Sequence, residues 1–155
     1  MNKDIKYNRN VLFVDDEELI LDKIKRKLKN CNFKLFFAQT GHHALRILDK
    51  KDIAVVVIDL SMPEFTGIEL LKIINNEYSD LVKIIFSIYT DVGLISSVSG
   101  QEIYQYIPKN RVNKEQGYKL EIIPIISNAV EKYNLVYENK LLKKELKKQR
   151  INSEE

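Results

Sequence analysis

The sequence predicts an α/β protein in which helices cover both faces of a five-stranded parallel sheet. Short runs of β-branched and aromatic residues alternate with segments that have apolar residues at helical spacing. The run at residues 54–58 is continuously apolar, as expected for a strand that is buried on both faces. Five such β/α units in about 130 residues favour a doubly wound sheet with three layers.

Each predicted strand is a short apolar run. The runs occupy residues 11–14, 34–38, 54–58, 84–86 and 104–107. The first and third runs end in aspartates, the fourth ends in a serine, and the fifth leads into Pro108 and Lys109. In a parallel sheet these ends lie at one edge, where ligands of doubly wound proteins bind.

The segments between the strands predict the helices. Residues 18–30 carry Ile20, Ile24 and Leu28 at intervals of four, and two further helices are expected around residues 44–48 and 68–74. Residues 91–101 are rich in Gly and Ser and predict only a short, weakly specified fourth helix. Residues 111–119 are expected to form a polar loop, followed by a helix over residues 120–149 with Pro124 in its first turn.

Composition indicates one globular domain. The 155 residues are 45% hydrophobic and 30% charged, and a net charge of +3 does not indicate nucleic-acid binding without a clustered patch. The single cysteine, Cys31, excludes an intramolecular disulfide. The first ten residues do not resemble a signal peptide, and the apolar runs are too short to span a bilayer. We therefore expect a cytoplasmic protein without a membrane segment.

Three carboxylates follow two of the predicted strands. Asp15 and Asp16 end the first strand and Asp59 ends the third, so these side chains are expected to meet at one edge of the sheet. Clustered carboxylates repel one another, and a hard cation such as Mg²⁺ relieves that repulsion. The alternative is that Asp15 and Asp16 only cap the first helix; the presence of Asp59 favours the metal site.

A hydroxyl and an ammonium are expected beside these carboxylates. Ser87 ends the fourth strand and Lys109 follows the fifth. Taken singly, each is more typical of an ordinary strand end or of a solvated surface lysine. Together with a carboxylate nucleophile and a cation, they make a phosphoryl-transfer site.

These residues resemble a known family. Residues 11–17, then 57–63 with Gly67, then Ser87 and Lys109, are similar to the receiver domain of response regulators in two-component signalling, over residues 10–133. The resemblance implies a flavodoxin-like fold with strand order 2-1-3-4-5. It also implies a receiver domain over residues 1–133 and a helical extension over residues 134–155.

The resemblance implies a metal and a phosphorylation site. Asp59 corresponds to the phosphoacceptor, and Mg²⁺ would be bound by Asp16, Asp59 and the backbone carbonyl of Ser61, with Asp15 acting through a metal-bound water. Pro63 and Gly67 would shape the loop behind the acceptor.

The resemblance also implies a switch. Ser87 corresponds to the hydroxyl that turns toward the phosphate, Lys109 to the lysine that pairs with it, and Tyr106 to the aromatic residue that changes rotamer. The partner would be a sensor histidine kinase or a phosphotransfer protein. The signal would pass through the face of helix 4, strand 5 and helix 5 and through the C-terminal helix.

The sequence departs from the family pattern beside the site. Asn110 follows the lysine where a proline is usual, so we expect a trans peptide there, or strain. Ile88 follows the switch serine where a small residue is usual, and it is expected to narrow access and slow phosphotransfer and hydrolysis. The fourth helix looks short by about one residue, and the loop after strand 5 looks long.

The end of the chain predicts a projecting helix with a heptad pattern. Leu135, Asn139, Leu142, Leu146 and Gln149 occupy seam positions, with Asn139 at an a site, which favours a parallel homodimer. The alternative is a single solvated helix. The basic residues lack interleaved aromatics, so nucleic-acid binding is not expected here. The helix resembles a stalk that leads to an output domain in a longer chain.

Three other functions share parts of this sequence pattern. An aspartyl-phosphate hydrolase would need an acid two residues after the nucleophile, where this chain has Ser61. A dinucleotide-binding domain would need a glycine-rich motif after the first strand, which is absent from the sequence. An unphosphorylated interaction module stays open because of Ile88 and Asn110. We expect no turnover enzyme, only self-catalysed phosphorylation and dephosphorylation.

Overall fold

The computed structural model describes residues 6–88, 96, 98, 100–112 and 116–154. Its centre is a five-stranded parallel sheet with the order β2-β1-β3-β4-β5, as expected. The strands are β1 (Asn10–Val14), β2 (Lys34–Ala38), β3 (Val55–Ile58), β4 (Val82–Ser87) and β5 (Gln105–Pro108).

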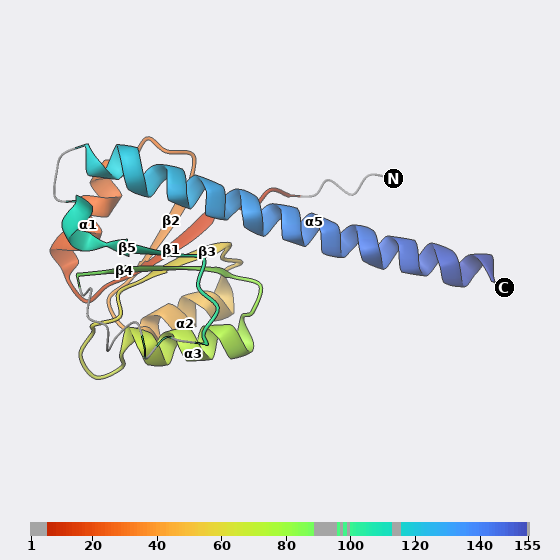
Figure 1. Ribbon diagram of the computed structural model, residues 1–155, viewed down its shortest axis with the longest axis horizontal. Coiled ribbons are helices and arrows are strands. Elements are labelled where there is room, and N and C mark those ends of the chain that lie inside the picture. The colour runs from red at the N-terminus through yellow and green to blue at the C-terminus, as the bar shows by residue number, and fades with distance from the viewer. Residues whose placement is uncertain (1–5, 89–95, 97, 99, 113–115, 155) are drawn as a thin grey trace.

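Helices cover both faces of this sheet, which confirms the three-layer prediction (Figure 1). The helices are α1 (Glu18–Lys27), α2 (Gly41–Lys50), α3 (Gly67–Glu77) and α5 (Ile123–Ser153). Helices α1 and α5 pack on one face, and α2 and α3 pack on the other. The predicted fourth helix, over residues 91–101, falls largely outside the described residues.

The alternation of side chains along the strands builds two separate cores. Val11 and Phe13 of β1 point to the core beneath α1 and α5, whereas Leu12 and Val14 point to the core beneath α2 and α3. Every residue of β3 is buried, as its continuous apolar run predicted.

Two helices begin at threonine caps. Thr40 Oγ1 accepts a hydrogen bond of 3.1 Å from His43 N, and Thr66 Oγ1 accepts one of 3.2 Å from Glu69 N. Each satisfies an amide that the first turn of a helix leaves unpaired, which fixes the start of α2 and of α3.

The predicted polar loop over residues 111–119 is wrong at both ends. Residues Lys109–Val112 form a 3-10 turn, and residues Tyr118–Ile122 form a π-helical turn that leads into α5. Val112 and Tyr118 are buried in the core beneath α1 and α5. The sequence pattern did not predict the burial of these two residues, because their neighbours in the chain are mostly polar.

The helix boundaries also differ from the predicted ones. Helix α1 ends at Lys27 rather than near residue 30, because Leu28 leaves helical geometry while its amide still donates to Ile24 O. Pro124 lies in the first turn of α5, as expected, and α5 continues to Ser153. None of the helices in the described ranges is long and apolar enough to span a bilayer.

The raised pKa values of two tyrosines predict that the protein loses stability at alkaline pH. A hydrogen bond from Tyr78 to Asp49, assisted by burial, raises the pKa of Tyr78 to about 12, and burial raises the pKa of Tyr133 to about 12. The unfolded chain releases these protons near pH 10, so their contribution to stability is complete below that pH and is lost as the pH rises toward 12. The ultraviolet absorbance of tyrosinate, followed against pH, is expected to show a late-ionising fraction.

The control is the double substitution Tyr78→Phe and Tyr133→Phe, which should remove part of that late fraction. Ionisation of all tyrosines together near pH 10, with the fold intact, would contradict the prediction.

Candidate functional site

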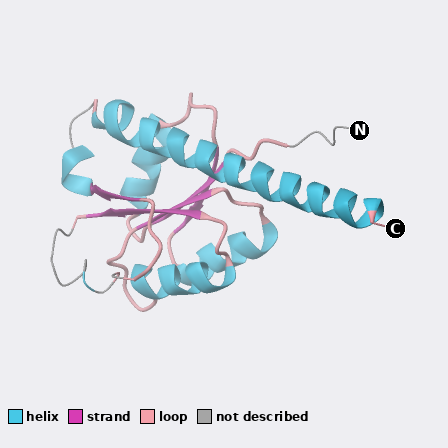
Figure 2. Ribbon diagram, turned by 45° about the vertical axis from the view of Figure 1, so that its right-hand side comes forward, coloured by secondary structure: helices cyan, strands magenta, loops and turns pink. Residues whose placement is uncertain are grey.

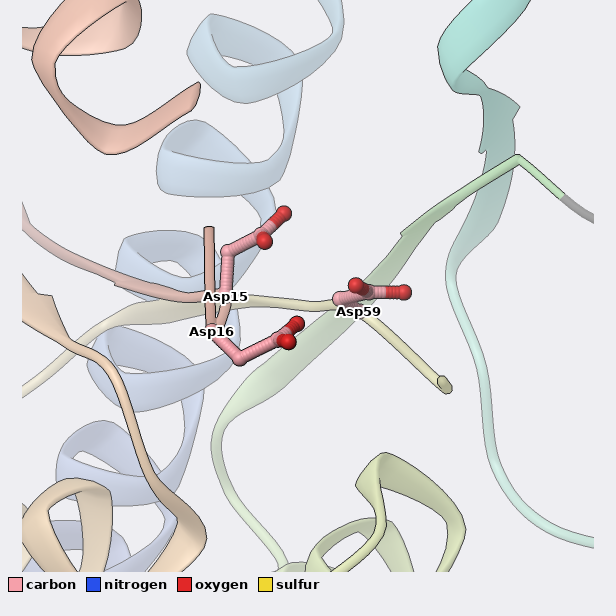
Figure 3. A group of neighbouring side chains, drawn as sticks. All are labelled: Asp15, Asp16 and Asp59. Carbon is pink, nitrogen blue, oxygen red and sulfur yellow. The ribbon is translucent and has the colours of Figure 1, made fainter. Parts of the chain in front are cut away.

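The site lies at the carboxyl edge of the sheet, where β1, β3, β4 and β5 end side by side. Backbone hydrogen bonds extend the ladder to the acidic residues: Asp15 N donates to Ala38 O at 3.0 Å, and Asp59 N donates to Val14 O at 2.9 Å. These hydrogen bonds therefore fix the backbone positions of Asp15 and Asp59. Figure 3 shows Asp15 and Asp16 side by side, with Asp59 next to them on the neighbouring strand end.

Three carboxylates converge as the sequence predicted. One oxygen each from Asp15, Asp16 and Asp59 lies within 4.8 Å of the other two. Asp15 and Asp59 are buried, whereas Asp16 is partly exposed, so solvent reaches the cluster from the side of Asp16. The N-cap of α1 is Glu17, and Asp15 Oδ1 accepts from its amide at 3.0 Å. Asp15 thus supports this helix start and belongs to the cluster as well.

Lys109 is not a solvated surface lysine. Its side chain is only 5% exposed, and its ammonium lies 2.5 Å from Asp15 Oδ2 and 3.1 Å from Asp59 Oδ2. The Nζ atom also lies 5.6 Å from the centre of the Phe86 ring. This contact with the aromatic ring was not expected from the sequence, although Phe86 directly precedes the predicted site residue Ser87 on β4.

Two further donors hold the Asp59 carboxylate. Ser87, which is fully buried, donates from Oγ to Asp59 Oδ1 at 3.2 Å, and Ser61 N donates to the same oxygen at 3.1 Å. With Lys109 on the other oxygen, Asp59 is oriented from both sides. The predicted metal ligand of Ser61 is its carbonyl, and that role stays a prediction.

Tyr106 and Ile88 lie beside Ser87. The Tyr106 hydroxyl donates to Ser87 O at 3.5 Å, and burial, with a further contribution from Asp59, raises the Tyr106 pKa. Ile88 is 52% exposed directly after the buried serine. No cis peptide occurs among the described residues, so the Lys109–Asn110 bond is trans, as expected.

The charges of the cluster are unbalanced. Burial raises the pKa of Asp15, and Lys109 offsets only part of that effect. Burial lowers the pKa of Lys109, but the hydrogen bonds and charges of Asp15 and Asp59 outweigh it, so the net pKa is raised. The three carboxylates outnumber the one ammonium, an imbalance that a divalent cation would offset.

The donor set fits a hard divalent cation. Carboxylate oxygens on one open side are the ligands that Mg²⁺ takes, with water completing its shell. Asp15 Oδ2 contacts the Lys109 ammonium and has no other hydrogen-bond donor among the described residues. The residues present could therefore hold Mg²⁺.

A close backbone approach sets the loop behind Asp59. A Cβ atom on Gly67 would lie 1.9 Å from the carbonyl oxygen of Asp59, so only glycine fits at the start of α3. A second close approach was not expected: a Cβ on Gly41 would lie 1.7 Å from the Phe65 ring, which stacks on His42. Both contacts join the β3–α3 loop to neighbouring elements.

Residues 11–119 match the family model of the response regulator receiver domain. The chain is 35% identical over 100 residues to the hydrogenase transcriptional regulatory protein HoxA of Cupriavidus necator, covering 64% of this chain and 20% of that protein. It is 30% identical over 141 residues to a putative NtrX-like response regulator of Rickettsia conorii, covering 83% of this chain and 30% of that protein. The chain thus spans less than a third of these relatives.

Solved structures agree on the fold. The signal receiver domain of an HD domain-containing protein from Pseudomonas fluorescens Pf-5 has a TM-score of 0.73 at 26% identity, covering 81% of this chain and 97% of that one. A structure described as adenylate cyclase from Rhodopirellula baltica has a TM-score of 0.75 at 24% identity, covering 88% of this chain and 98% of that one.

Replacing Gly67 by alanine tests the close approach. The added methyl group collides with backbone at Asp59, not with a flexible side chain, so Gly67→Ala is expected to lower the free energy of unfolding by about 1–3 kcal/mol. Denaturant unfolding measures this change. The matched control is Gly117→Ala, where the added Cβ would lie 3.0 Å from its nearest neighbour, Val112 Cα. This substitution should lower the free energy of unfolding by less. Equal losses would contradict the account.

Adding Mg²⁺ tests the carboxylate cluster. A cation that binds only the folded chain stabilises it by about 1.4 kcal/mol at ten times its Kd, so the melting temperature should rise by several degrees. Asp16→Asn should reduce the rise, whereas Glu131→Gln, on the exposed side of α5, should not. A rise that is equal in all three proteins would show that the ion acts elsewhere.

Proposed function

The chain belongs to the response regulator receiver domain family of two-component signalling, and from this premise we propose that it is a phosphorylation-dependent switch with Asp59 as its phosphoacceptor. The observation that carries the proposal is the surroundings of Asp59. This buried carboxylate has an ammonium on one oxygen, a hydroxyl and an amide on the other, and two further carboxylates close by.

These groups suit nucleophilic phosphoryl transfer. An Asp59 oxygen attacks phosphorus and forms a P–O bond, while the bond between phosphorus and the donor breaks and its electron pair leaves with the donor. Lys109 and Ser87 are placed to pair with oxygens of the incoming group. Mg²⁺, held by Asp16, Asp59 and the Ser61 carbonyl, with Asp15 acting through water, would offset negative charge on that group.

The same contacts suggest how the switch would work. Phosphorylation adds roughly −1.5 to −2 charges and three acceptor oxygens at neutral pH. Lys109, which now bridges Asp15 and Asp59, and Ser87, which now donates to Asp59, would re-pair with the phosphoryl oxygens. Tyr106 contacts the backbone of Ser87, so it would follow that movement.

The expected partners follow from this chemistry. A sensor histidine kinase or a phosphotransfer protein would supply the phosphoryl group. The phosphorylated state would be read at β5, α5 and the segment before β5.

We further propose that residues 1–133 are the receiver and that residues 134–155 lead to an output domain in a longer chain. Both curated relatives described above are longer proteins. The chain would catalyse only its own phosphorylation and dephosphorylation.

A small-molecule phosphodonor tests the phosphoacceptor directly. Incubation with the donor and Mg²⁺ should add one phosphoryl group to the intact mass of the wild type. Asp59→Asn should add none, because it removes the nucleophile, whereas Asp22→Asn, an exposed aspartate on α1, should behave as the wild type. No adduct in the wild type under any condition would favour an unphosphorylated interaction module.

Ile88 is proposed to restrict access to the phosphorylated site. It is half exposed directly after Ser87, where it can screen the phosphoryl group from attacking water. Ile88→Ala is therefore expected to shorten the lifetime of the phosphorylated protein, measured by the decay of the adduct after the donor is removed. An unchanged lifetime, or an ordinary one already in the wild type, would contradict this role.

A further inference from the structure

The second half of α5 projects from the domain (Figures 1 and 2), and the one ion pair that joins it to the other described residues is that of Lys140 with Asp80. The helix buries Ile126, Ala129, Val130 and Asn134 and is exposed at nearly every later position. Leu135, Leu142 and Leu146 are 53%, 46% and 59% exposed. We propose that this projecting segment pairs with the same segment of a second copy of the chain in a parallel, in-register coiled coil.

The exposed leucines lie on the side of α5 opposite the domain. Each residue turns an α-helix by about 100°. On that basis the mean direction of the four buried residues and that of the seam (Leu135, Asn139, Leu142 and Leu146) differ by about 180°. Two helices can therefore meet along the seam while each domain lies on the outside of the pair. The seam can begin at Leu135, immediately after the last residue that is buried against the domain.

The charges beside the seam specify a parallel orientation. With Asn139 and Leu146 at a, the g positions are Glu138 and Glu145, and the e positions are Lys143 and Arg150. In a parallel pair, each g residue faces the e residue five places further along the partner helix, so Glu138 meets Lys143 and Glu145 meets Arg150. An antiparallel pair would bring glutamates to glutamates and basic residues to basic residues. Asn139 facing its own copy fixes the register.

Hydrogen bonds of Asn134 hold α5 against the domain at the point where the projecting segment begins. Asn134 Oδ1 accepts from Asn8 N at 2.8 Å, and Asn134 Nδ2 donates to Asn8 O and to Val130 O, both at 2.8 Å. Nearly two turns further along the helix, Lys140 forms an ion pair with Asp80. These contacts fix the direction in which α5 leaves the domain, and they leave the opposite side free for a partner helix.

The seam is short, so the pair is expected to be weak. It spans about two heptads, below the three or four that make a strong coiled coil. Self-association should therefore depend on protein concentration. It does not require phosphorylation of Asp59, so the tests below are done without a phosphodonor, and their outcome is separate from that of the proposed function.

Charge inversion tests the orientation. The double substitution Lys143→Glu with Arg150→Glu, and separately Glu138→Lys with Glu145→Lys, should each weaken self-association by about tenfold or more, because attractive pairs become repulsive. Mixing the two variants should restore association. The matched control is Lys144→Glu with Lys147→Glu, which changes the net charge equally, from +3 to −1, but lies outside the flanks of the seam. Sedimentation equilibrium over a range of concentrations measures each association constant.

Disulfide cross-linking tests the register. In a Cys31→Ser background, Leu142→Cys should cross-link to itself readily, whereas Lys144→Cys, outside the seam, should not. A mixture of Leu135→Cys and Gln149→Cys would cross-link between unlike chains only in an antiparallel pair. A monomer at every concentration, equal weakening by the control substitution, or cross-links mainly between unlike chains would each overturn the proposal.

Discussion

The ion pairs of Lys109 with Asp15 and Asp59 are the interaction on which the rest of the site depends. The parallel sheet brings strand ends together, so the carboxylates that follow β1 and β3 meet at one edge whatever their mutual repulsion. A buried carboxylate needs a compensating charge. Lys109 supplies it from the end of β5 and is itself buried only because two carboxylates surround it. Three carboxylates still surround a single ammonium, which makes the cluster receptive to a divalent cation.

The sequence predicted the parts of this account that depend on local patterns. The continuous apolar run of β3 followed by Asp59 predicted both a central strand and the acidic edge. The strand order came from the family resemblance. Close approaches between distant segments were not predictable, as between Phe65 and Gly41. Val112 and Tyr118 were also missed, because two apolar anchors in a polar stretch have no periodicity to detect.

The two ends of the molecule are connected through β5 and α5. Lys109 begins the 3-10 turn that buries Val112, and Gly117, whose Cβ would approach Val112 Cα to 3.0 Å, precedes the turn that leads into α5. A movement of Lys109 would therefore act on the segment that seats the helix. At the far edge of the sheet, Asn134 ties α5 to the segment before β1. The charged site and the projecting helix thus lie at opposite ends of the strands of one sheet.

The most direct test of the central claim is a crystal structure of the chain with Mg²⁺ and beryllofluoride, a mimic of the phosphoryl group. The account predicts beryllium bonded to an Asp59 oxygen, with fluorides within hydrogen-bond distance of Ser87 Oγ and Lys109 Nζ and with Mg²⁺ among Asp15, Asp16 and Asp59. An Asp59 carboxylate that stays unmodified and still paired with Lys109, at saturating concentrations of both ions, would contradict it.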